Sequence, residues 1–150
     1  MTLQMPWGFL SVELAVCLWI LLVLAADLLL PSARKSSLWA LSFTGIVVFT
    51  ALLVWQQATG MSGTFQDMLV IGPFSRYFKG LFLLTVAAVI VMTREFHRHL
   101  RANLGAFYLL LLSVLLGMLV LASINDLLML FLGLELLTFS LYIMAAYLRT

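Results

Sequence analysis

One carboxyl group stands out in this chain because of where it falls. Glu135 is the only formally charged residue between Leu127 and Leu148, a run of otherwise uncharged and mostly apolar residues. A charged side chain near the centre of a bilayer costs roughly 2.5–3.5 kcal/mol on insertion scales, and acids inside membrane helices often mark ion or proton pathways. A carboxyl group can gain and lose a proton, whereas leucine and serine can only pack. The residue type and its place therefore point to proton transfer.

The helical spacing around Glu135 collects polar side chains on one side. With about 100° between successive helical residues, Thr138, Tyr142 and Arg149 fall within about 60° of Glu135. Such a polar stripe is expected to face a bundle interior or a hydrated cavity rather than lipid. Thr138 and Tyr142 are therefore candidate partners of Glu135 in a proton path. The alternative is structural, with a neutral glutamic acid that hydrogen-bonds to a neighbouring helix.

The composition indicates that lipid is the solvent for most of these residues. Of the 150 residues, 65% are hydrophobic and 9% are charged, whereas about a quarter are charged in soluble domains. The net charge of +2 gives no indication of nucleic-acid binding. Cys17 is the single cysteine, so there is no disulfide framework, and there is no P-loop or GxGxxG. A metal site at His97 and His99 is disfavoured because no further His or Cys stands nearby. No cofactor is expected in this chain.

Five stretches are long enough, or nearly so, to cross a hydrocarbon core of ~30 Å as helices of about 20 residues. They are residues 8–30, 38–55, 74–93, 106–123 and 127–148. The third includes Arg76 and Lys79, whose side chains are expected to snorkel from its first turns towards lipid headgroups. Glu13 is expected near the interface, and Gln56–Gly72 is expected to form a surface loop. The predicted fold class is an all-α membrane protein with about five transmembrane helices.

Three residues within the spans are expected to make close helix contacts. Trp19 lies in the middle of the first span, where packing against a neighbouring helix is favoured over an interfacial position. Gly133 lets a neighbouring helix approach, and Gly117 does the same within a Ser113-xxx-Gly117 motif.

The distribution of Lys and Arg predicts the orientation. Short cytoplasmic loops carry an excess of these residues. If the chain crosses five times, only Arg76 and Lys79 fall on one side, and the other six basic residues fall on the opposite side. The N-terminus is therefore expected outside and Arg149 in the cytoplasm.

The most specific pattern is FYLLLLSVLLGMLVLASINDLLMLFLGLELLTFSLYIMAAYLRT at the end of the chain. Its Gly117-Met118, Asp126-Leu127, Gly133-x-Glu135-Leu136 and Leu141-Tyr142 closely resemble the subunit N family of bacterial NADH–quinone oxidoreductase, respiratory complex I. These proteins are antiporter-like membrane subunits. The earlier stretches VELAVCLWILLVLAADLL and RYFKGLFLL agree more loosely. One departure is Gly72, where the family often has an acid before PFSRYFK.

The resemblance implies roles for particular residues. Glu135 would be the family's intramembrane glutamate, a proton carrier that works with lysines on later helices. Lys79 matches an FFK-like position of the family, a weaker indication. Residues 1–105 would form three leading helices, and residues 106–150 the first two helices of the first of two inverted repeats. The chain is thus expected to be the N-terminal part of a longer subunit, as a fragment, a truncated product or half of a split subunit.

The resemblance also implies that the chain lies in a bacterial inner membrane, and it implies partners. These are the other membrane subunits of the complex, the missing C-terminal part of the same subunit and the lipid bilayer, with no nucleic acid. NADH, flavin, iron–sulfur clusters and quinone would bind in other subunits. Two alternatives remain at this point. One is a component of a related multisubunit cation/proton antiporter, and the other is a purely structural membrane bundle.

The predicted topology can be tested with single cysteines at Ser62 and Ala102, in a background where Cys17 is replaced by serine. A membrane-impermeant thiol reagent added to intact cells should label position 62 and leave position 102 unlabelled, because an odd number of spans separates them. Labelling of both positions from one side would show that the assignment of residues 74–93 as a single span is wrong.

Overall fold

The computed structural model describes residues 10–29, 37–60, 62–65, 67–96 and 104–147. This part of the chain contains the helices α1 (Ser11–Leu29), α2 (Ser37–Ala58), α3 (Pro73–Phe96), α4 (Leu104–Ala122) and α5 (Leu127–Tyr147). It also contains the strands β1 (Gly63–Phe65) and β2 (Leu69–Ile71). All 5 helices are long and apolar enough to cross a membrane. The predicted all-α membrane bundle is therefore confirmed.

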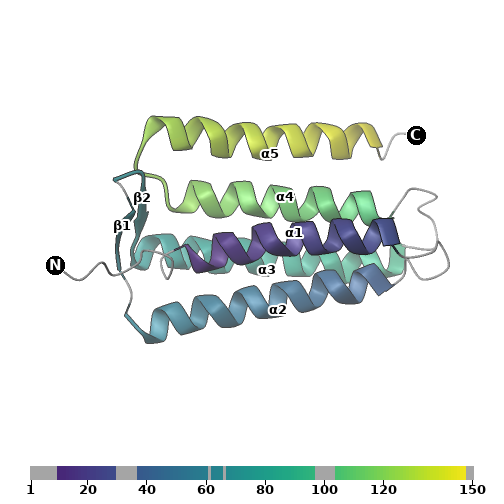
Figure 1. The fold of residues 1–150 in the computed structure, drawn as a ribbon, viewed down its shortest axis with the longest axis horizontal. Helices are drawn as coiled ribbons and strands as arrows, with labels where there is room; N and C mark the ends of the chain where they lie inside the picture. The colour runs from purple at the N-terminus through teal and green to yellow at the C-terminus, as the bar shows by residue number, and fades with distance from the viewer. Residues whose placement is uncertain (1–9, 30–36, 61, 66, 97–103, 148–150) are drawn as a thin grey trace.

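Helices α1 to α4 form a bundle in which α1 and α3 occupy opposite corners (Figure 1). Each of these two helices packs against both α2 and α4. Helix α5 lies outside the bundle and packs on α4. Within the most apolar 18-residue stretch of each helix, 50% of the residues are buried in α4 and 11% in α5. The core is apolar and includes Val16, Phe49, Leu83, Ile90, Leu112 and Leu115.

The segment predicted as a surface loop, Gln56–Gly72, is more ordered than expected. Helix α2 continues to Ala58, and β1 then pairs with β2 as an antiparallel hairpin. The hairpin reaches the chain that follows α4, because Val70 N–H donates to Ser123 O at 2.7 Å and Asn125 N–H donates to Met68 O at 3.0 Å. The hairpin thus closes one end of the bundle (Figure 1). Strands of 3 residues are too short to leave a periodic signal in the sequence.

Trp19 packs against α2, as predicted. Its Nε1–H donates to Leu41 O at 3.1 Å, and its ring meets that of Phe49 edge-to-face with centroids 5.9 Å apart. The indole fits because residue 45 is glycine, since a Cβ atom there would overlap the Trp19 ring. A polar ring N–H inside a membrane bundle needs such an acceptor, and α2 supplies it from its backbone.

Gly117 and Gly133 bring α4 and α5 together, also as predicted. A Cβ atom at Gly117 would lie 3.1 Å from Gly133 O and 3.1 Å from the Leu137 Cβ. A Cβ atom at Gly133 would lie 3.0 Å from the Leu121 side chain. Small residues let helix backbones approach closely where lipid supplies no hydrophobic driving force. Ser113 contributes differently, because its hydroxyl donates to Leu109 O within α4.

The Trp19 contact gives a prediction about stability. Gly45→Ala should destabilise the bundle by about 1–3 kcal/mol, because the indole must move and its bond to Leu41 O is lost. Gly80→Ala is the matched control, since the added Cβ atom would meet Leu53 at an ordinary 3.5 Å. The measurement is thermal unfolding of the purified variants in one detergent. Equal melting temperatures for the two variants would contradict the contact.

Candidate functional site

Glu135 lies on the side of α5 that faces away from the bundle. Gly133 faces α4, and two residues along a helix correspond to a rotation of about 200°. Glu135 is accordingly exposed, with Tyr142 further along the helix 74% exposed. Thr138 is half-buried, and its hydroxyl donates to Leu134 O at 2.8 Å and to the backbone Glu135 O at 3.3 Å. The carboxyl group of Glu135 has no hydrogen bond or ion pair with the residues that the structure describes.

The expectation that this polar stripe faces the bundle interior is therefore wrong for the described chain. The close approach at Gly133 fixes the rotation of α5, and that rotation directs the stripe outward. Arg149, the last member of the predicted stripe, lies outside the described residues. Apolar side chains surround Glu135 on the outward face, with Phe131 at 62% and Phe139 at 64% exposure. Lipid can solvate these rings, but an acid among them needs a polar neighbour.

Lys79 occupies a different place from the one expected. Its side chain is fully buried, and its Nζ lies 2.5 Å from Oε1 of Glu13, whose side chain is 8% exposed. The predicted snorkelling of Lys79 towards headgroups is wrong. Glu13, which was expected near the interface, has its side chain buried within the bundle. A buried ammonium group is stable only with a close counter-charge, and Glu13 of α1 supplies it. The structure does not bring Lys79 together with Glu135.

Glu13 was not identified from the sequence as the partner of Lys79, although the sequence contains an indication of this pair. Helices α1 and α3 both begin at the hairpin end of the bundle, so they run in the same direction (Figure 1). Glu13 is the third residue of α1 and Lys79 the seventh of α3. An acid and a base near the starts of two parallel spans lie at comparable depth, where long side chains can meet. Because Lys79 was expected to snorkel towards headgroups, its comparable depth with Glu13 was not considered.

Neutral polar side chains form hydrogen bonds at the same end of the bundle as the ion pair. Gln56 of α2 is fully buried, and its Nε2–H donates to Ser11 Oγ at 2.8 Å. Ser75 of α3 and Ser123, just beyond α4, share a hydrogen bond of 2.8 Å. All four corner helices therefore direct polar groups towards this end of the bundle.

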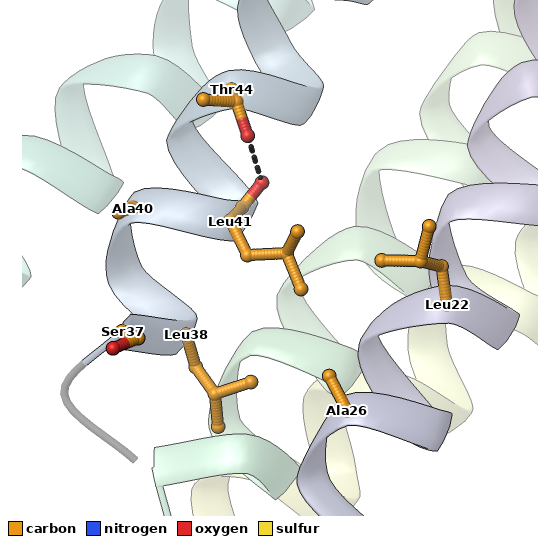
Figure 2. Close-up of a pocket in the computed structure, with 7 residues that line it drawn as sticks. All are labelled: Leu22, Ala26, Ser37, Leu38, Ala40, Leu41 and Thr44. Carbon is orange, nitrogen blue, oxygen red and sulfur yellow. Dashed lines mark hydrogen bonds between the residues drawn. The ribbon is translucent and has the colours of Figure 1, made fainter. Parts of the chain in front are cut away.

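Two further features, an apolar groove and the histidine pair, add no candidate catalytic or metal-binding group within the described residues. An apolar groove between α1 and α2 is lined by side chains such as Leu22, Ala26 and Leu41, and its Thr44 hydroxyl donates to Leu41 O within α2 (Figure 2). Within the described ranges there is no group of three or more His, Cys, Asp or Glu side chains that could hold a metal ion. The His97 and His99 pair lies outside those ranges.

The chain is similar to membrane subunits of quinone oxidoreductases from several bacteria. It is 39% identical to NAD(P)H-quinone oxidoreductase subunit 2 of Synechococcus sp. (strain JA-3-3Ab), over 90% of this chain and 26% of that protein. It is 30% identical to NADH-quinone oxidoreductase subunit N of Chlorobium chlorochromatii, over 99% of this chain and 29% of that protein. The corresponding subunit N of Desulfitobacterium hafniense is 33% identical over 93% of this chain and 28% of that protein. No family model matches the chain.

These similarities, together with the bundle of apolar helices, define a multi-pass membrane protein. The chain corresponds to the N-terminal portion of homologues named NADH-quinone oxidoreductase subunit N, with 30–39% identity over most of its length. It spans between 26% and 29% of the length of the curated relatives named above.

The buried ion pair gives a second prediction about stability. Lys79→Gln should destabilise the bundle by about 3–5 kcal/mol, because it leaves the Glu13 carboxylate buried without its counter-charge. The double variant Glu13→Gln, Lys79→Gln removes both charges and should recover most of this loss. The measurement is the melting temperature of each variant in the same detergent. A double variant less stable than either single variant would show that the two side chains are not coupled.

Proposed function

We propose that the chain takes part in proton translocation as the N-terminal part of a membrane subunit of NADH–quinone oxidoreductase. Quinone reduction takes place elsewhere in the complex, and the chain contributes a route for protons through the membrane. The observation that carries this role is the place of Glu135, a carboxyl group within a membrane span and without a partner in the described chain. The similarity to these homologues supports the assignment to this complex.

The exposed face of α5 that carries Glu135 is where further helices would pack. A charged group in hydrocarbon is costly without a partner, and the described chain offers Glu135 none. The relatives are more than three times as long as the chain, as their coverage of 26–29% implies. We therefore place the remainder of a family-length subunit against this face of α5. A cation there, such as a lysine, would favour the carboxylate when near and the carboxylic acid when distant. Movement of that cation would load or unload the proton.

Thr138 and Tyr142 have secondary roles in this proposal. The Thr138 hydroxyl is held by the backbone of α5 one turn from Glu135, and the Tyr142 hydroxyl lies on the exposed side of the same helix. Both would contact the added helices or order water beside the carboxyl group. Lys79 is engaged by Glu13 and is therefore the weakest member of the predicted site.

The other parts of the assembly follow from the same proposal. NADH, flavin, iron–sulfur clusters and quinone bind to other subunits, and the neighbouring membrane subunits are the partners of this chain. The hairpin end faces the outside, because six of the eight basic residues fall on the opposite side. The names of the relatives favour this function over that of a cation/proton antiporter component.

Glu135→Gln in the full-length subunit, assembled in its complex, tests the proposal. The amide keeps the size and hydrogen bonding of the side chain but cannot titrate. We expect assembly to survive and proton pumping to fall at least tenfold, whereas Glu135→Asp should retain part of the activity. Proton uptake into vesicles is measured alongside NADH–quinone turnover.

Glu95→Gln is the matched control, since it makes the same chemical change beyond the membrane-spanning part of α3, Pro73–Arg94. It should leave pumping unchanged. Full pumping by a well-assembled Glu135→Gln variant would contradict the proton role and leave the acid as a structural contact.

A further inference from the structure

The pair of Glu13 and Lys79 crosses the centre of the bundle. Helices α1 and α3 sit on opposite corners and each packs on α2 and α4, so the two long side chains meet between four helices. Both side chains are buried, and their atoms Oε1 and Nζ are 2.5 Å apart. The site holds a carboxylate and an ammonium group with no net charge, inside the span of the membrane helices.

One oxygen atom of this site is not accounted for by its contacts. Oε2 of Glu13 is buried and has no hydrogen-bond partner among the described residues. An ionised carboxylate accepts hydrogen bonds at both oxygens, and a buried polar atom without a partner is costly. A water molecule or a proton at Oε2 would remove this cost. Oε2 is therefore the atom of the pair that is available to accept a proton or a hydrogen bond.

The two partners differ in how completely they are buried. Glu13 keeps 6% of its surface exposed, whereas Lys79 keeps none. Glu13 is also the nearer of the two to the start of its helix, beside the half-buried Ser11 at the hairpin end. The carboxyl group is therefore the less enclosed of the two charged groups and lies nearer the hairpin end.

The surroundings of the pair are mostly neutral. Helix α2 presents Gln56 there, and Ser123 lies just beyond α4. Helix α3 also carries Arg76, whose Nη1–H donates to Gln56 O at 3.3 Å, and α1 carries Cys17 one turn beyond Glu13. Arg76 is the nearest further cation along the same helix.

We propose that Glu13 and Lys79 form a second proton-exchange site of this chain, separate from Glu135. A proton from water at the hairpin end bonds to Oε2 of Glu13, which becomes a neutral carboxylic acid. Lys79 keeps its proton throughout, so the site carries one positive charge while the added proton is bound. The proton then leaves Oε2 for water by the same route, which restores the carboxylate beside the ammonium group. One proton is taken up and one is released in each cycle. This inference goes beyond the role proposed for Glu135 and does not depend on it.

The test is solid-state NMR on the full chain in lipid nanodiscs, with glutamate labelled with ¹³C at its side-chain carboxyl carbon. The chain has three glutamates, Glu13, Glu95 and Glu135, so Glu95→Gln together with Glu135→Gln leaves one labelled side chain. We expect the chemical shift of Glu13 to change between its ionised and protonated positions as the pH of the buffer is lowered, while the chain remains folded.

Lys79→Gln in the same background gives an independent readout. Loss of the ammonium group removes the charge that holds the carboxylate, so the transition of Glu13 should move to higher pH by at least one unit, a tenfold change in proton affinity. A Glu13 signal that stays ionised until the chain unfolds would overturn the proposal and leave the pair as a fixed clamp. An unchanged transition in the Lys79→Gln variant would overturn it as well.

Discussion

The contact of Gly117 in α4 with α5 at Gly133 decides which way Glu135 points. With Gly133 against α4, Glu135 lies about 200° around the helix and faces away from the bundle. The site proposed for proton transfer is therefore an open face rather than an enclosed cavity. Its completion depends on what covers α5, the helix with the least buried span of the described chain. A larger residue at either glycine would separate the two helices and change this orientation.

The chain places its intramembrane charges in two contrasting settings. Glu13 and Lys79 are brought together across the bundle and neutralise each other within it. Glu135 stands alone on an exposed face among phenylalanine and leucine side chains. Lipid is a poor solvent for both kinds of charge. The first setting supplies its own counter-charge, whereas the second requires a partner from outside the described chain. This difference distinguishes an internal site of the leading helices from a surface where the rest of a family-length subunit would dock.

Much of the fold could be predicted from the sequence because hydrocarbon thickness dictates the length of an apolar helix. The five spans, the packing role of Trp19 and the close approach at Gly133 all follow from local composition and spacing. The hairpin could not be predicted, because its pairing with the segment after α4 links residues far apart in the chain. The outward direction of Glu135 could have been predicted by combining the packing role of Gly133 with the helical period. The ion pair required knowing which helices share the core, since Glu13 and Lys79 are 66 positions apart.

The central claim is that Glu135 changes its protonation state while the enzyme turns over. Infrared difference spectroscopy of the assembled complex, with and without NADH, measures this most directly when glutamate is labelled with ¹³C. The account predicts a labelled carboxyl band that appears or disappears on turnover and is absent in Glu135→Gln, with the other glutamate bands retained. Identical difference spectra for the native complex and the Glu135→Gln complex would contradict it.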